Sequence, residues 1–123
     1  MIYCKQSNNV NPLVEKPTIV SSDRGISIKF SNLHIQFGKR KVPYANEYVC
    51  QEALWLPVLF DDMNYTVLVT KPQMGNGMSV LDYIPFGQSQ DREKILAGYH
   101  NPKASFRPGQ MLEINYLAIW VKH

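Results

Sequence analysis

The stretch MLEINYLAIWVKH, Met111–His123, decides the fold because it has the pattern of a strand that is apolar on both faces. One set of alternate positions is wholly apolar and contains Leu112, Ile114, Tyr116, Ala118 and Trp120. The other set contains Met111, Glu113 and Asn115 and is apolar from Leu117 onward, with Ile119 and Val121. A strand with one solvated face keeps one set polar along its whole length. We therefore expect a central strand whose second face meets a partner.

Upstream of this strand, a period-two pattern runs from Gly25 to Phe37 and predicts a hairpin of two half-buried strands. Its apolar alternate positions are Ile26, Ile28, Phe30, Leu33, Ile35 and Phe37. Ser31-Asn32 forms the expected turn, and Pro43 is expected to end the second strand. The alternation gives His34 an outward or inter-subunit position.

Further short segments complete an all-β pattern. Strands are expected at 51–60, 65–70 and 78–86, with weaker candidates near 18–20 and 104–107. Pro57 makes the first of these an edge or bulged strand, because proline donates no ladder hydrogen bond. The best helix candidate, Asp91–Ala97, is only about two turns long, and such isolated helices are marginal.

Many short strands separated by turn residues predict a small antiparallel β-sandwich or barrel. Residues 1–24 have turn and linker composition and are expected to be a lead-in segment, whereas 25–123 form the folded domain. A length of 123 residues, with 45% apolar and 19% charged residues, suits one such domain.

Bulk composition argues against several classes of partner. The net charge of +3 is modest, so nucleic acid is not expected. The sequence has no run near the roughly 18 apolar residues of a membrane helix, so membrane insertion is not expected either. Cys4 and Cys50 lack metal or redox spacing and are expected to be free thiols in a reducing compartment.

The search for catalytic motifs finds none of the common signatures, so we expect neither an enzyme, nor a cofactor, nor a metal site. The segment 83–107 is richer in polar and aromatic groups. Sugar recognition uses planar polar groups for hydroxyls and aromatic faces for rings, and binding sites favour loops on a β scaffold. The expected ligand-binding residues are Tyr83, Arg92, Lys94, Tyr99, His100, Asn101 and Arg107.

Three motifs resemble the C-terminal domain of bacteriophage tail-fibre proteins. SNLHIQFGK, residues 31–39, is similar to the family's NGLIIQWGK hairpin. LWLPVLFDDMNYTVLVTKP, residues 54–72, is similar to its xVTFPxxFxxxPYxVxxTP strand pair, and INYLAIWV, residues 114–121, to its INWIAIGY terminus. Order and spacing agree over residues 25–123. Phe37 and Tyr116 replace tryptophans of the family pattern, and Trp120 replaces a glycine.

The resemblance implies an H-type-lectin-like β-sandwich that assembles as a parallel homotrimer and binds host surface glycans. It implies a virion component, made in the cytoplasm of the bacterial host. In such a trimer, the neighbouring subunits would cover the second face of the terminal strand. The expected interface residues are Leu117, Ile119, Val121 and His34.

Three functions remain open at the level of sequence. The leading one is a receptor-binding domain that recognises host carbohydrate, where several weak sites would add up to firm attachment. The second is a structural trimerisation or capping module of a virion fibre with no ligand of its own. The third is a glycan-degrading fibre tip.

Overall fold

The computed structural model describes residues 15–71 and 83–123, which form eight strands and, in these two ranges, no helix. The strands are β1 (Thr18–Ser22), β2 (Gly25–Lys29), β3 (Leu33–Asn46), β4 (Val49–Trp55), β5 (Tyr65–Thr70), β6 (Ile84–Ser89), β7 (Lys94–His100) and β8 (Met111–Val121). Every neighbouring pair is antiparallel. The expected strands near 18–20, at 65–70 and at the C-terminal end are confirmed, as is the hairpin around Ser31-Asn32.

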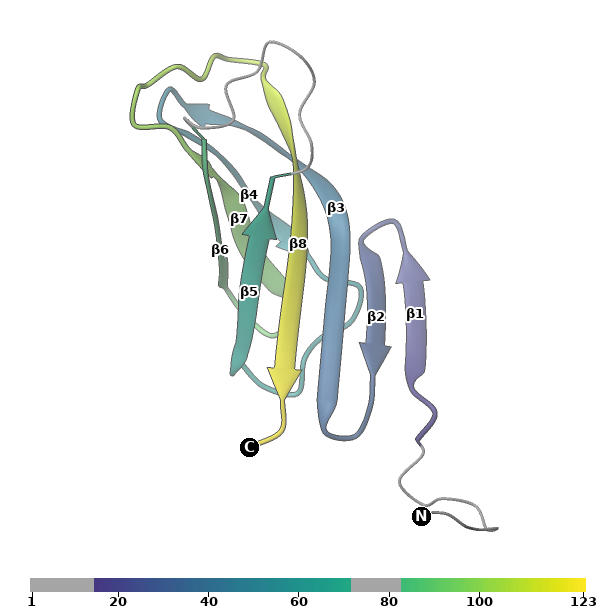
Figure 1. Ribbon diagram of the computed structural model, residues 1–123. Helices are drawn as coiled ribbons and strands as arrows, with labels where there is room; N and C mark the ends of the chain where they lie inside the picture. The colour runs from purple at the N-terminus through teal and green to yellow at the C-terminus, as the bar shows by residue number, and fades with distance from the viewer. Residues whose placement is uncertain (1–14, 72–82) are drawn as a thin grey trace, which may run out of the picture.

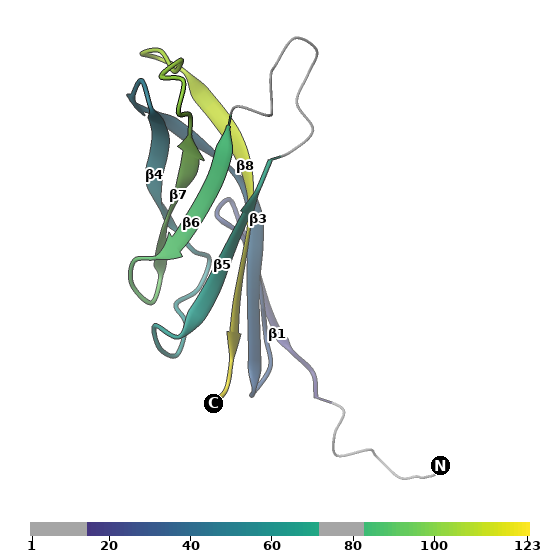
Figure 2. The same cartoon turned by 60° about the vertical axis from the view of Figure 1, so that its left-hand side comes forward.

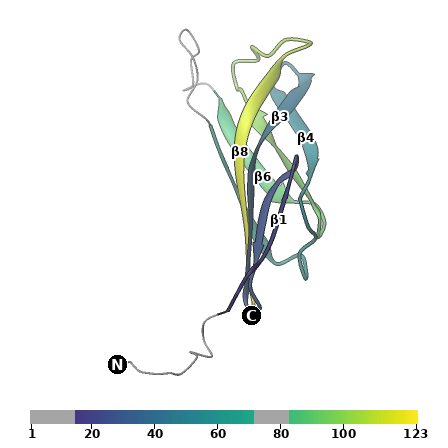
Figure 3. The same ribbon diagram turned by 90° about the vertical axis from the view of Figure 1, so that its right-hand side faces the viewer.

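The strands form a sheet that curls into two facing layers (Figure 1). One layer has the order β1-β2-β3-β8-β5, and the other contains β4, β7 and β6. Strand β3 belongs to both, because its end pairs with β4 at Tyr44 and Asn46 after pairing with β8 along its first eleven residues. Figures 2 and 3 show the layers from the side. The architecture agrees with the expected antiparallel sandwich.

The core lies between the layers and uses the apolar set of β8 that the sequence identified. Ile114, Tyr116 and Trp120 are at most 4% exposed. They face Ile95 and Tyr99 of β7, whose side chains are fully buried. Alternation along β8 thus correctly predicts which of its residues enter the core.

The β2–β3 hairpin is reversed relative to the usual arrangement, because its polar residues face inward. Ser27, His34 and Gln36 are at most 1% exposed. His34 and Gln36 pair in register with the buried Trp120 and Ala118. The expected outward position of His34 is therefore wrong: its side chain lies inside the sandwich.

The apolar residues of the hairpin consequently lie on the outside of the first layer. Ile19, Ile28, Ile35 and Ile119 are paired in sequence across β1, β2, β3 and β8 and form one row. Ile26, Phe37, Leu117 and Leu68 form a parallel row across β2, β3, β8 and β5. Leu33 and Val121 pair beside the first row. We call these ten residues the outer apolar face.

Neither Pro43 nor Pro57 has the effect on its strand that the sequence predicts. Strand β3 continues past Pro43 to Asn46. Tyr44 donates its N–H to Gln110 O at 2.9 Å, on the β8 side. N–H groups point to alternate sides along a strand, so the N–H that Pro43 lacks would have pointed toward the β4 side. The pairing of β3 with β4 begins only after Pro43, so no ladder hydrogen bond is lost there. Pro57 lies beyond the end of β4, which is not an edge strand because β3 and β7 flank it.

The helix expected at Asp91–Ala97 is wrong, because residues from Lys94 onward form β7. Ile95, Ala97 and Tyr99 alternate into the core, and β7 pairs with β4 and β6 on its two sides. Two ladders of hydrogen bonds outweigh the weak propensity of a two-turn helix. The weaker candidate near 104–107 is also wrong, since no strand forms there.

Strands β5 and β6 approach closely where the two layers meet, although no backbone pairing joins them within the described residues. A Cβ added to Gly87 of β6 would lie 2.5 Å from Val69 Cγ2 and 2.8 Å from Val67 Cγ1 of β5. Glycine is therefore needed at this seam for steric reasons.

Some expectations fall outside the described residues or stay predictions. Cys4 and the part of the expected 78–86 strand before residue 83 lie outside them. The described remainder of that strand is β6, which begins at Ile84. The domain boundary at residue 24 stays a prediction, although β1 pairs with β2 along its whole length.

His34 is a buried ionisable group with an incomplete set of partners. Its Nε2 lies 2.7 Å from Ser27 Oγ, and Phe60 packs against the ring edge-to-face with centroids 4.6 Å apart. Nδ1 has no hydrogen-bond partner among the described residues. The pKa of His34 is lowered to about 4, chiefly by burial and also by the nearby charge of Lys29, while Asp61 opposes the shift.

We expect stability to decrease as the pH falls from about 6.5 to about 4. In this window the unfolded chain binds a proton at His34 that the folded chain does not bind, and the pKa difference amounts to about 3 kcal/mol. Below about pH 4 this contribution becomes constant. Urea unfolding at several pH values and one protein concentration measures the slope. His34→Gln should flatten it, and an unchanged slope in that variant would contradict the assignment.

Candidate functional site

The buried side chain of Gln36 holds the segment that connects β4 to β5 through hydrogen bonds to its backbone. The side-chain amide donates from Nε2 to Val58 O at 2.8 Å and accepts from Val58 N at Oε1 at 3.0 Å. Both bonds are made by one planar group, so they fix the position and the orientation of the Val58 peptide units. An inward polar side chain on β3 thus holds an irregular segment 22 residues away in sequence.

The turn between β6 and β7 is joined to the same segment by backbone hydrogen bonds. Leu56 N donates to Glu93 O and Phe60 N to Arg92 O, each at 2.7 Å. Arg92 returns a bond from Nε to Phe60 O at 2.8 Å. Tyr65 of β5 donates its hydroxyl to Asp91 O, and burial raises the pKa of this tyrosine to about 12. These bonds leave the turn little freedom to move relative to the sandwich.

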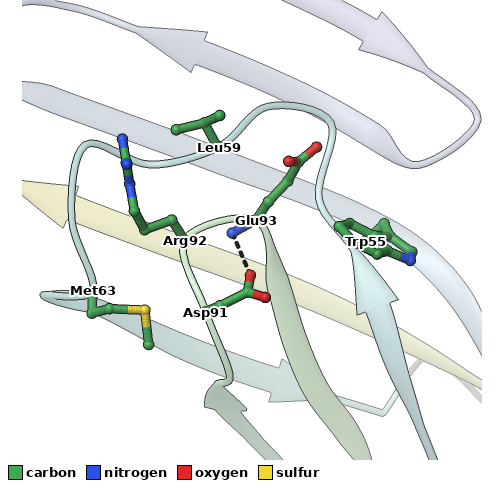
Figure 4. A pocket seen from close by; sticks show the side chains of 6 residues that line it. All are labelled: Trp55, Leu59, Met63, Asp91, Arg92 and Glu93. Atoms are coloured by element: carbon green, nitrogen blue, oxygen red, sulfur yellow. Dashed lines mark hydrogen bonds between the residues drawn. The ribbon is translucent and has the colours of Figure 1, made fainter.

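A hollow of about 460 Å³ lies between this turn and the β4–β5 segment (Figure 4). We call it the Trp55 hollow; its lining consists of Trp55, Leu59, Met63, Asp91, Arg92 and Glu93. Figure 4 shows Trp55 and Met63 at opposite ends of the group, with the three residues of the turn between them. The hollow is shallow and open to solvent rather than enclosed.

The lining combines exposed apolar surface with charged groups. Trp55 is 46% exposed, and Leu59 and Met63 are each 43% exposed. Lys94 Nζ lies 4.9 Å, and Arg24 Cζ 5.8 Å, from the centroid of the Trp55 ring, which is within the range of cation–π attraction.

The same two cations also contact the carboxylates of the turn. Arg24 Nη1 lies 3.5 Å from Glu93 Oε2, and Lys94 Nζ lies 4.0 Å from Asp91 Oδ2. Asp91 Oδ1 also accepts a bond from Glu93 N at 2.8 Å (dashed in Figure 4). The indole, the two cations and the two carboxylates thus restrain one another. Such a group can bind hydroxyls through its carboxylates and stack a ring against its aromatic face.

The ligand-binding residues expected from the sequence do not form one site. Arg92 and Lys94 lie at the start of β7, beside the Trp55 hollow, whereas His100 ends β7 and Arg107 follows it. A strand of seven residues spans about 20 Å, so the two groups are well separated.

Three of the expected residues have structural roles near the end of β7. Tyr99 is fully buried and donates its hydroxyl to Glu113 O at 2.7 Å. Asn101, also fully buried, accepts from Lys103 N at 2.9 Å and contacts Ser105 Oγ. Tyr83 packs against Tyr99, with ring centroids 6.1 Å apart. His100 and Arg107 are exposed.

Sequence reasoning missed the apolar half of the Trp55 hollow. Trp55 and Leu59 lie in the run LWLPVLF, 54–60, where exposed residues alternate irregularly with the buried Leu54, Leu56 and Phe60. A continuous apolar run gives no indication of which members are exposed. In the bend before β5, Asp62 Oδ1 accepts a hydrogen bond from Asn64 N at 2.7 Å.

Other kinds of site are not seen in the described parts of the chain. Residues 15–71 and 83–123 contain no group of three or more His, Cys, Asp or Glu side chains that could hold a metal ion. No helix in the same ranges is long and apolar enough to cross a membrane. Cys50 is a buried free thiol whose pKa is raised by burial.

Solved structures with the same fold exist. The chain is similar to an N-truncated R1-type pyocin tail fibre, with a TM-score of 0.54 and 14% identity over 85% of this chain and 84% of that chain. It is also similar to the C-terminal residues 323–701 of the R1 pyocin fibre of P. aeruginosa, with the same TM-score and identity, over 85% of this chain but only 28% of that chain. At this identity the likeness concerns the fold. No protein-family model and no curated protein matches the sequence.

We expect Gln36→Leu to destabilise the fold by about 2 kcal/mol, because it leaves the N–H and C=O of Val58 without their side-chain partner. The midpoint of urea unfolding measures the change. Gln88→Leu, at an exposed position of β6, is the control and should change stability by less than about 0.5 kcal/mol. Equal stability of the two variants would show that the Gln36 contacts contribute nothing.

Proposed function

We propose that this chain is the receptor-binding domain of a phage-type tail fibre, and that it binds carbohydrate on the host surface as a parallel homotrimer. It acts in the virion, without catalysis, without a cofactor, and without binding nucleic acid or inserting into a membrane. The fold it shares with the pyocin tail fibres supports the tail-fibre assignment, together with the three sequence motifs that resemble this family.

The outer apolar face is the observation that carries the proposal. Its members include Ile19, Leu68 and Val121, which are 63%, 51% and 50% exposed in the single chain. Apolar rows of this extent on a soluble protein mark an interaction surface. Ser27, His34 and Gln36 of the β2–β3 hairpin are buried on the opposite side of the layer. The hairpin therefore has the polarity expected of a sheet whose outer face is also covered.

In a homotrimeric fibre, neighbouring copies of the same chain lie around the fibre axis. A second copy of the chain is therefore the partner that would cover the outer apolar face. Leu117, Ile119 and Val121 are then interface residues, as expected from the sequence, and His34 is not, because it faces the core. Three binding surfaces held in one trimer strengthen attachment to a repetitive surface without any additional contact.

A trimerisation or capping module is the second candidate. One observation favours it: Tyr83, Tyr99 and Asn101, three of the expected ligand-binding residues, pack within the domain. It requires the same outer apolar face but no ligand. Binding to carbohydrate separates the two candidates, and the release of reducing ends would instead indicate the glycan-degrading alternative.

We expect Ile119→Asp to dissociate the trimer, since an unpaired carboxylate buried in each interface costs about 3–5 kcal/mol. Sedimentation at micromolar concentration should give a trimer for the unmodified chain and a monomer for the variant. Gln88→Asp introduces the same charge at an exposed position of β6 and should remain trimeric. A monodisperse monomer for the unmodified chain would refute the assembly, and a trimeric Ile119→Asp would remove Ile119 from the interface.

We also expect avidity to depend on assembly. The unmodified trimer should bind immobilised polysaccharide from a susceptible bacterial surface at least about 100-fold more tightly than the Ile119→Asp monomer, because linked sites rebind. Surface plasmon resonance at low and high density of polysaccharide measures the difference. Equal binding by trimer and monomer at both densities would contradict multivalent attachment, and absence of binding by both would favour the capping module.

A further inference from the structure

We propose that the Trp55 hollow binds one pyranose ring of the receptor glycan, through the C–H face of the ring and a pair of adjacent free hydroxyls. The inference rests on the proposed carbohydrate-binding function and specifies where on the domain the sugar binds. The sequence analysis expected binding residues throughout the segment 83–107. The proposed site instead lies at one end of the sandwich and is formed by the β4–β5 segment and the β6–β7 turn.

The apolar part of the hollow suits the face of a sugar ring. Pyranoses have a C–H face that stacks on an indole, and Trp55 presents nearly half of its surface to solvent. Leu59 and Met63 are exposed to almost the same extent and line the same hollow. Large apolar side chains gathered around a concave site, rather than scattered singly, are typical of ligand recognition.

The polar part suits a pair of adjacent hydroxyls. A carboxylate accepts two hydrogen bonds side by side, which matches the spacing of vicinal hydroxyls, and such charge-assisted bonds are stronger than neutral ones. Asp91 and Glu93 provide two carboxylates on one turn, and Arg92 adds a guanidinium. Each carboxylate already faces a cation, Arg24 for Glu93 and Lys94 for Asp91, so neither presents an unpaired negative charge to the hydroxyls of a ring.

The hollow is organised before a ligand arrives. Backbone bonds from Leu56 and Phe60 fix the turn, and Gln36 fixes the peptide units of Val58. Lys94 and Arg24 restrain the indole relative to the carboxylates. Binding to a preorganised site avoids much of the entropy lost when loops become ordered, which matters for a ligand that makes few contacts.

The contacts that restrain the indole are exposed, so changes here should leave the fold intact. The side chains of the Arg24–Glu93 pair are 43% and 33% exposed, and surface ion pairs of this kind contribute little to stability. Trp55 lies at the end of β4, in the layer that does not carry the outer apolar face. Replacing the Trp55 side chain should therefore change ligand binding without changing assembly through the outer apolar face.

The test compares variants on an array of bacterial surface oligosaccharides, with circular dichroism and sedimentation as checks of fold and assembly. Trp55→Ala and Asp91→Asn should each lower the signal of every oligosaccharide bound by the unmodified chain by tenfold or more. Tyr48→Ala is the matched control, because Tyr48 is also 46% exposed but lies in the β3–β4 turn. It should retain full binding.

Fluorescence supplies a second readout. The chain has two tryptophans, and Trp120 is only 4% exposed, so acrylamide should quench mainly Trp55. A bound oligosaccharide should protect the unmodified chain from quenching, and Trp55→Phe should abolish this protection while retaining part of the binding.

The outcomes distinguish the inference from the function on which it rests. Binding that survives in Trp55→Ala, or that is lost instead in His100→Ala/Arg107→Ala, overturns the site but leaves the proposed carbohydrate-binding function standing. Failure of the unmodified trimer to bind any oligosaccharide overturns both. Loss of binding in Trp55→Ala and Asp91→Asn alone, with fold and assembly intact, supports the site.

Discussion

The pairing of β3 with β8 is the constraint on which the rest of the structure depends. It runs without a break from Leu33–Val121 to Pro43–Met111. Because β8 has a wholly apolar set of alternate residues that must enter the core, the register determines which residues of β3 accompany them. A shift by one residue would turn His34 and Gln36 outward and Ile35 and Phe37 inward. The register therefore creates the outer apolar face and the polar interior together.

Through this pairing, one strand serves two surfaces of the molecule. The outward side chains of β3 contribute Ile35 and Phe37 to the proposed subunit interface. Its inward side chains contribute Gln36, which anchors the segment beside the Trp55 hollow. The proposed interface and the proposed binding site would thus share a rigid element, although they use opposite faces and opposite layers. Substitutions in the two short connections can change the hollow while the strands that carry the outer apolar face stay the same.

Sequence periodicity was a good guide to most strands and to the two faces of β8, but a poor guide to the faces of the β2–β3 hairpin. Tyr65–Thr70 and Met111–Val121 were predictable because β-rich runs with clear limits have few alternatives. The direction of His34 and Gln36 was not, because it depends on partners such as Phe60 and Val58 that the chain brings near only after folding. Strand β7 was mistaken for a helix because neighbouring ladders, not local propensity, decide its conformation. The Trp55 hollow was hidden for a similar reason, since its apolar and charged halves come from separate segments.

The seam between β5 and β6 gives the sandwich an unequal resistance to opening. Elsewhere, separating neighbouring strands breaks a ladder of backbone hydrogen bonds, as between β3 and β8. At the seam, contact depends on Gly87 lying against the side chains of Val67 and Val69. Local fluctuations favour openings that break the fewest bonds. The two layers therefore separate most readily along the contact between β5 and β6. Solvent reaches the interior of the sandwich through this opening first.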